Sequence, residues 1–138
     1  MRFQGRVYKD SGGWLVEVPV FDAMSQGRTR IESLDMIKDW FVTMVDKPGF
    51  AVEIHSGKSG DFEIGSDDLR SMIGLLLQRR RQQSGLSLAE AAERLGARSR
   101  NAYARYERGE SLPTMEKLDQ LLKAVSHGRD FVVKESVA

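Results

Sequence analysis

The stretch Leu86-Ser-Leu-Ala-Glu-Ala-Ala-Glu-Arg-Leu-Gly-Ala-Arg-Ser-Arg-Asn-Ala-Tyr-Ala-Arg-Tyr-Glu-Arg-Gly109 decides the fold of the second half of the chain. It predicts two short helices joined by a tight turn. Ser87 is placed to be an N-cap, and Glu90, three residues later, completes a capping box. Gly96 is expected to end the first helix in the left-handed conformation. We expect the second helix to run from about residue 99 to 108.

The second predicted helix has a buried face and a polar face. Tyr103 and Tyr106 lie three residues apart and are expected in the core, whereas Arg100, Asn101 and Arg105 point outward. A small helix, a glycine turn and a cationic second helix are typical of a helix-turn-helix, whose second helix enters the DNA major groove. The alternative is a small helical bundle of another function, which shows the same capping and periodicity.

The polar side chains of this segment fall into two groups, one suited to DNA bases and one suited to phosphates. Arginine suits guanine and asparagine suits adenine, so base contacts are assigned to Arg100, Asn101 and Arg105. Three residues near the helix starts are better placed for phosphates and positioning: Ser87, Arg98 and Ser99. Since a lone helix-turn-helix contacts only a few base pairs, we expect a homodimer or higher oligomer on an inverted repeat.

Positive charge is concentrated on the same segment. The formal net charge of the whole chain is only +1, and residues 1–66 carry 8 Lys/Arg against 10 Asp/Glu, a net charge of −2. Residues 77–109 carry 8 Lys/Arg against 3 Asp/Glu, a net charge of +5. This distribution is the one that phosphate binding requires.

The segment and its flanks resemble the Cro/repressor-type (Xre-like) helix-turn-helix family. The resemblance is carried by Gly85-Leu86-Ser87, Leu88 to Leu95 with Ala92 at the helix crossing, Gly96, and Glu107-Arg108-Gly109. It implies an ion pair between Arg81 and Glu107 that locks the first helix to the end of the recognition helix. Leu88 departs from the family, which usually has glutamine there, and the segment between Gly96 and Glu107 is one residue longer than usual.

The first 65 residues predict a compact α+β domain with an antiparallel sheet and one main helix. Strands are expected at 2–9, 14–20, 50–54 and 61–64, with a short third strand around 23–25. An amphipathic helix is expected from Thr29 or Arg30 to about Asp46.

This domain resembles the HicB-type antitoxin domain, a truncated ribonuclease-H-like fold. The resemblance is carried by Val7-Tyr8-Lys9-Asp10, the glycine pair that follows, Trp14 to Val20, and the helix from Thr29. A domain of this kind followed directly by an Xre-like helix-turn-helix is an architecture of HicB antitoxins.

The sequence predicts a boundary near residue 65. Residues 1–65 form the expected HicB-like toxin-neutralising domain, and residues 66–138 the helix-turn-helix domain, all helical, with a C-terminal tail. Ser66 is expected to cap a helix over 67–83, and Thr114 caps the last helix, which Gly128 ends.

Two segments of the second domain leave alternatives open. Arg79-Arg80-Arg81 fits a solvated face, a phosphate clamp, or both, and one of the three is a candidate structural residue. Phe131-Val132-Val133 predicts either a final strand or a partner-binding tail.

No cluster of residues predicts catalysis, so we expect no enzyme activity, catalytic residue, metal or cofactor. Four carboxylates are conceivable ribonuclease-H-type metal ligands: Asp10, Glu17, Asp22 and Asp35. Asp10, however, heads a Gly-Gly turn, where aspartate is expected for backbone reasons. His55 and His127 fall in different predicted domains. The resemblance agrees, since HicB domains are regarded as having lost nuclease activity.

The composition indicates where in the cell the protein is expected. The chain has no cysteine and no run of about twenty apolar residues, and its amino terminus lacks the apolar run of a signal peptide. We expect a cytoplasmic protein without a membrane partner.

The resemblances together imply an antitoxin of a type II toxin–antitoxin pair. Its first domain is expected to inhibit a HicA-type mRNA-cleaving toxin, and its second to repress its own operon by binding double-stranded operator DNA. Trp14 and Phe21 are weak candidates for toxin contact, because a small domain needs such side chains for its core. The alternative is a stand-alone transcriptional repressor whose first domain senses a small ligand; a residual nuclease is a third hypothesis.

Overall fold

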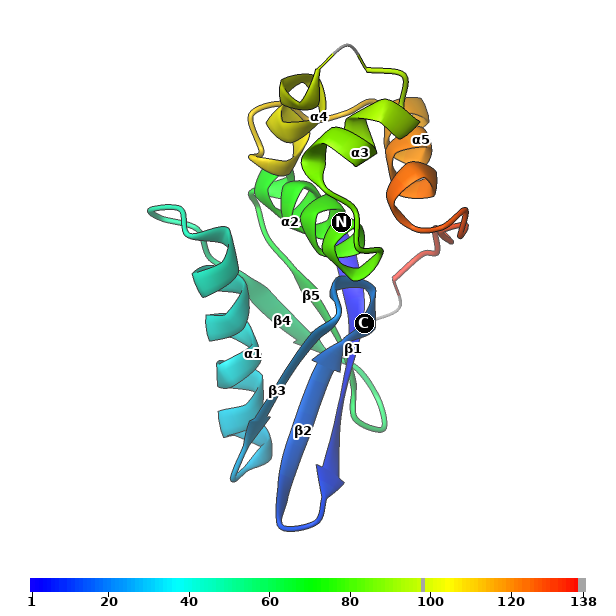
Figure 1. Ribbon diagram of the computed structural model, residues 1–138. Helices are drawn as coiled ribbons and strands as arrows, with labels where there is room; N and C mark the ends of the chain where they lie inside the picture. Colours follow the sequence, from blue (N-terminus) through cyan, green and yellow to red (C-terminus); the bar gives the residue numbers. More distant parts are fainter. Residues whose placement is uncertain (98, 137–138) are drawn as a thin grey trace. The chain divides into compact units, whose positions relative to one another are not determined.

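The computed structural model describes residues 1–97 and 99–136 and divides into two compact units (Figure 1). The first unit comprises residues 1–69 together with the chain from Glu135 on, and the second comprises residues 70–134. The first contains a sheet and a helix, and the second is helical. The predicted fold class, an α+β domain followed by an all-α helix-turn-helix domain, is confirmed.

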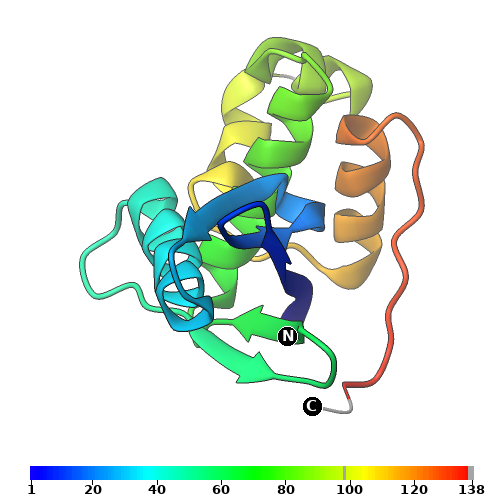
Figure 2. The same cartoon turned by 90° about the horizontal axis from the view of Figure 1, so that it is seen from below.

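The first unit is built on a five-stranded antiparallel sheet in the order β3-β2-β1-β5-β4. The strands are β1 (Arg2–Asp10), β2 (Gly13–Val18), β3 (Ala23–Gly27), β4 (Glu53–Ser56) and β5 (Asp61–Gly65). Helix α1 (Arg30–Val45) packs against β3, β2 and β1 (Figure 2). Thr29 caps α1 by accepting a hydrogen bond from the amide of Glu32 at 3.0 Å.

The bounds of β2 and β4 differ from the predicted ones for local structural reasons. Strand β2 ends at Val18 because Pro19 has no amide hydrogen for the ladder and instead begins a short 3-10 helix, Pro19–Phe21. Strand β4 begins at Glu53 rather than at Phe50, since Phe50 closes a turn by donating its amide to the carbonyl of Lys47. The short third strand is present as β3.

The core of the first unit is organised by aromatic rings. Phe21 contacts Phe3 and Phe41 edge to face, each at 4.9 Å between ring centroids, and Phe21 has no exposed surface. Its assignment as a toxin contact is therefore not retained, because a fully buried ring offers nothing to a partner. Trp14 is partly exposed.

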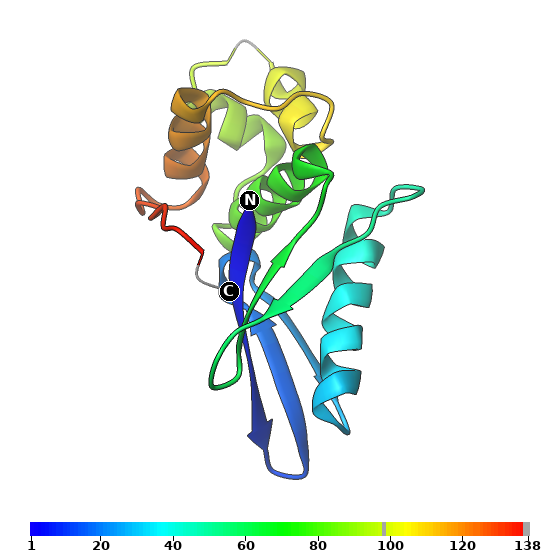
Figure 3. The same cartoon turned by 180° about the vertical axis from the view of Figure 1, so that it is seen from behind.

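The second unit contains α2 (Leu69–Gln83), α3 (Leu88–Arg94), α4 (Arg100–Glu107) and α5 (Met115–Val125) (Figure 3). Every residue of α2 from Ser71 to Leu77 is buried. Thr114 caps α5 as expected, through the amide of Lys117 at 3.1 Å. The described part of the tail, 129–136, contains no strand. No helix of the described chain is long and apolar enough to cross a membrane.

The units divide four residues later than expected because residues 66–68 are tied to the first unit. The Ser66 hydroxyl donates to the carbonyl of Ala51 and accepts from the amide of Asp68. Asp68 also pairs with Lys47 at 2.7 Å. Helix α2 therefore begins at Leu69 rather than at residue 67.

Gly74 lies in the middle of α2, where glycine lowers helix stability unless packing demands it. A β-carbon at Gly74 would lie 2.5 Å from the carbonyl oxygen of Glu107 and 2.9 Å from that of Tyr106. The glycine thus allows the end of α4 to lie directly on α2.

We predict that Gly74→Ala destabilises the protein by about 1–3 kcal/mol, since the added carbon meets backbone atoms that have little room to move. Helix propensity alone predicts the opposite sign, a gain of about 1 kcal/mol. Urea unfolding followed by circular dichroism at 222 nm measures the difference. A stabilised variant would show that the close approach is absent.

Candidate nucleic-acid interface

Helix α3 begins with the predicted capping box. The Ser87 hydroxyl accepts from the amide of Glu90 at 3.1 Å, and the Glu90 carboxylate accepts from the amide of Ser87 at 3.2 Å. The hydrogen bond from the Ser87 backbone lowers the pKa of Glu90. The stability that this hydrogen bond contributes is therefore present above the ordinary pKa of a glutamate carboxyl. It is lost as acidification protonates the Glu90 carboxylate.

A glycine turn separates α3 from α4. Gly96 adopts the left-handed conformation, with φ +66°, and its amide donates to the carbonyl of Glu93 at 2.9 Å. The amide of Ala97 donates to the carbonyl of Ala92, also at 2.9 Å. These two bonds occupy carbonyls that the end of the helix leaves open, as in a Schellman motif. Ala91 and Ala92 are buried, and α3 packs against α4.

Helix α4 has the predicted division of faces. Arg100, Asn101 and Arg105 are exposed, whereas Tyr103 is 1% exposed. Burial raises the pKa of Tyr103, whose hydroxyl lies 3.5 Å from the carbonyl oxygen of Leu77 in α2. Tyr106, which was also expected in the core, is only partly buried, so Tyr103 holds the aromatic side of α4 in the core while the polar side remains open.

Two of the three residues assigned to phosphates lie at the starts of helices. Ser87 and Ser99 are the exposed N-cap residues of α3 and α4, and the Ser99 side chain makes no capping hydrogen bond. Arg98 lies outside the described residues. Sequence reasoning missed Ala102, which is exposed on α4 beside Asn101. Its position next to Asn101 was the available signal, since a small apolar side chain on an exposed helix face is of the kind that contacts a thymine methyl.

Arg81 and Glu107 form the ion pair that the family resemblance implies. Arg81 Nε lies 2.6 Å from Glu107 Oε1 and Nη2 lies 3.1 Å from Oε2, a bidentate geometry. Their side chains are only 12% and 8% exposed. Arg81 Nη1 also donates to the carbonyl of Leu86 at 2.8 Å. The hydrogen bond with Glu107 raises the pKa of Arg81.

Two arginines of the run 79–81 have structural partners. Besides Arg81, Arg80 is buried, and its guanidinium lies 3.3 Å from the Ser126 hydroxyl and 5.8 Å from the centre of the Phe131 ring. The same guanidinium donates to Gln83 at 2.7 Å. The sequence predicted one structural arginine in this run, whereas both Arg80 and Arg81 have such a role.

The carboxylates considered for metal binding do not meet. In residues 1–97 and 99–136, no three His, Asp or Glu side chains gather as a metal site. Glu17 is instead paired with Arg6 across β1 and β2.

A comparison with known protein families identifies the domain type of the second unit. Residues 73–130 match the model of a family described as a helix-turn-helix domain, which covers most of α2 and all of α3, α4 and α5. No protein of curated function matches the chain. Residues 73–130 therefore form a helix-turn-helix domain, a fold that supports DNA binding and transcription regulation.

We predict that Glu107→Ala destabilises the protein by about 3 kcal/mol, because the guanidinium of Arg81 is left largely buried without its carboxylate. Differential scanning calorimetry measures the change in melting temperature. DNA affinity falls with it, since the end of α4 loses its anchor.

The matched control is Glu110→Ala. Glu110 pairs with Arg108 at 2.7 Å, but both side chains are about half exposed. Exposed pairs contribute little, so this change is expected to alter stability by less than about 1 kcal/mol. Equal effects of the two variants would contradict the structural role of the Arg81–Glu107 pair.

Proposed function

We propose that the protein is an antitoxin that inhibits a HicA-type mRNA-cleaving toxin and represses its own operon. The observation that carries the proposal is the exposed polar face of α4 within a helix-turn-helix domain. The HicB-like resemblance of the first domain supplies the toxin half, and no catalytic step is assigned to this chain.

In the proposed complex α4 lies in the major groove of the operator. Arg100 and Arg105 donate to guanine and Asn101 to adenine. Arg105 Nε lies 3.7 Å from Glu110 Oε2, and the Arg105 side chain is 63% exposed. This exposed, long ion pair is weak, so the Arg105 guanidinium can leave it to contact a base. Ser87 and Ser99 donate to phosphates on either side and fix the position of α4.

The net negative charge of residues 1–66 supports a basic partner for this part of the chain. An enzyme that cleaves mRNA binds a polyanion and therefore needs a positive surface. Residues 1–66 carry a net charge of −2, opposite in sign to such a surface. Attraction of this kind raises the rate of association more than it determines final affinity.

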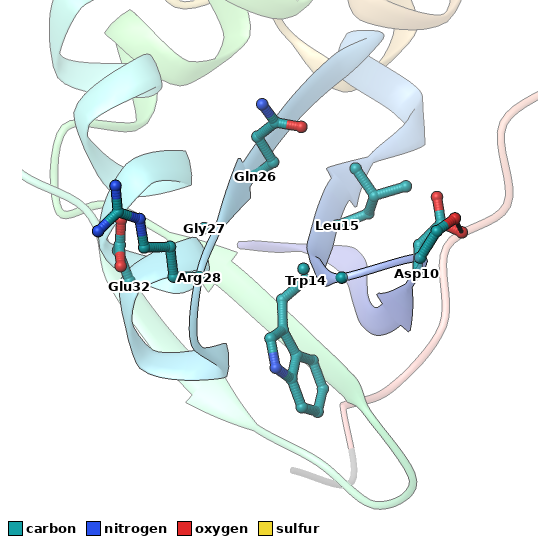
Figure 4. A pocket seen from close by; sticks show the side chains of 10 residues that line it. Asp10, Trp14, Leu15, Gln26, Gly27, Arg28 and Glu32 are labelled. Carbon is teal, nitrogen blue, oxygen red and sulfur yellow. Dashed lines mark hydrogen bonds between the residues drawn. The ribbon is translucent and has the colours of Figure 1, made fainter.

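A second candidate function, ligand sensing, is favoured by a cleft in the first unit. The cleft has a volume of about 410 Å³ and is lined by residues of the β1–β2 turn, β3 and the start of α1. Figure 4 shows the indole of Trp14 in the middle, with Asp10 on one side and Arg28 and Glu32 on the other. A small polar ligand with an aromatic part suits these walls. Thermal shift of the purified protein with pools of metabolites tests this alternative.

We predict that Arg100→Ala and Asn101→Ala each weaken binding to the DNA upstream of the gene by about 5- to 100-fold, because each removes a base contact. Fluorescence anisotropy at fixed salt measures the loss, with Arg129→Ala as the control, since Arg129 is exposed beyond the end of α5. An equal loss on unrelated DNA would show that these residues contact phosphates rather than bases.

The toxin half is tested by growth rescue in cells that express the adjacent small open reading frame. We expect the full chain to relieve growth arrest, and the variant carrying Arg100→Ala and Asn101→Ala to relieve it equally while losing repression of a reporter. No arrest, or arrest that the full chain does not relieve, favours the ligand-sensing repressor.

A further inference from the structure

Glu110 lies directly beyond α4, and the turn that ends this helix fixes its backbone. Gly109 has φ +69° and donates its amide to the carbonyl of Tyr106 at 3.1 Å. The amide of Glu110 donates to the carbonyl of Arg105, also at 3.1 Å. These two hydrogen bonds form a Schellman motif, in which the chain folds back over the last turn of the helix. The turn therefore holds Glu110 beside Arg105, a residue assigned to a base.

The carboxylate of Glu110 is shared by two arginines at the end of α4. Arg108 Nε lies 2.7 Å from Oε1 and Arg108 Nη2 lies 3.3 Å from Oε2. Arg105 Nε lies 3.7 Å from the same Oε2. The hydrogen bond from Arg108 lowers the pKa of Glu110, and the charges of Arg108 and Arg105 add to this effect. The carboxylate is therefore ionised at neutral pH and offsets one of the two positive charges.

Neither the stability of α4 nor attraction to DNA explains a carboxylate at this place. The C-terminal end of a helix is the negative end of its dipole, where cations rather than anions are stabilising. The side chains of Arg105, Arg108 and Glu110 are 63%, 52% and 48% exposed, and ion pairs so exposed contribute little to folding. Beside a residue that contacts DNA, a carboxylate also repels phosphates. The effect that remains is on how the two arginines meet DNA.

We propose that Glu110 is a specificity-determining residue that keeps Arg105 from phosphates but not from guanine, an inference that rests on the DNA half of the proposed function. On unrelated DNA, Arg105 gains only a phosphate contact, and the Glu110 carboxylate competes with the phosphate for the same guanidinium. On the operator, Arg105 donates two hydrogen bonds to guanine, which together are stronger than an exposed ion pair. Glu110 therefore weakens binding to unrelated DNA more than binding to the operator.

This difference matters to a repressor because unrelated sites vastly outnumber the operator in a genome. The occupancy of the operator depends on the ratio of the two affinities rather than on the affinity for the operator alone. A residue that removes a phosphate contact on unrelated DNA raises that ratio, even though it adds no contact to the operator. Glu110 is placed to have this effect, since its carboxylate reaches a base-contacting arginine and is itself held by the turn.

The experiment compares the full chain with its Glu110→Gln variant, which keeps the size of the side chain and removes its charge. Fluorescence anisotropy at several salt concentrations measures the affinity for the DNA upstream of the gene and for an unrelated duplex of equal length. We expect the ratio of the two affinities to fall at least about threefold, because the released Arg105 gains a phosphate contact only on unrelated DNA. The release of Arg108 occurs on both duplexes and cancels in the ratio. The salt slope should steepen by about 1 more on unrelated DNA than on the upstream DNA.

Two control variants separate this effect from a change in net charge. Glu116→Gln removes the same charge from an exposed residue of α5 and should leave the ratio unchanged. In a chain that carries Arg105→Ala, the addition of Glu110→Gln should also leave the ratio unchanged, because Glu110 acts through Arg105. Circular dichroism melting confirms that each variant is folded.

An unchanged ratio in Glu110→Gln, or an equal fall in Glu116→Gln, would overturn the proposal. Weaker binding of Glu110→Gln to the upstream DNA, with unchanged binding to unrelated DNA, would overturn it as well, since Glu110 would then orient Arg105 toward the base. These outcomes leave the proposed function intact. If the original chain binds both duplexes equally or binds neither, the DNA half of the proposed function fails together with this inference.

Discussion

The ion pair between Arg81 and Glu107 is the constraint on which the DNA-binding unit depends. One guanidinium joins three parts of the chain: the end of α2, the carbonyl of Leu86 before α3, and the last residue of α4. Burying both charges costs solvation, which bidentate geometry only partly repays, so the pair contributes more to orientation than to stability. Orientation is what a recognition helix needs, because a base contact tolerates little error in the position of the side chain.

Helix α2 provides the surface against which this orientation is set. Gly74 brings the backbone of α4 onto α2, and Leu77 offers its carbonyl to the buried hydroxyl of Tyr103. Farther along α2, Arg80 reaches the Ser126 hydroxyl just after α5. Successive turns of one helix thus contact both α4 and the end of α5. A change in α2 is therefore expected to alter DNA binding although no residue of α2 is assigned to DNA.

The sequence predicted the features that depend on residues close together in the chain, and it missed those that depend on distant residues. The capping box of α3, the turn at Gly96 and the exposed face of α4 depend on residues a few positions apart, so the pattern alone indicated them. The start of β4, the two roles within the run 79–81 and the close approach at Gly74 depend on residues far away in sequence. Arg79, Arg80 and Arg81 have the same chemistry, and only the partners brought by folding distinguish them. The exposed fraction of Phe21 likewise depends on the Phe3 and Phe41 rings beside it.

A short connection between the units limits the operators that the expected homodimer can bind. Only residues 66–68 separate β5 from α2, and three residues span at most about 10 Å. Recognition helices on B-DNA must be about 34 Å apart, or a multiple of that distance, to enter successive major grooves on one side. A dimer formed through the first units cannot adjust that spacing through a long flexible linker. The half-site spacing of such an operator therefore depends on how the first units of two copies pair.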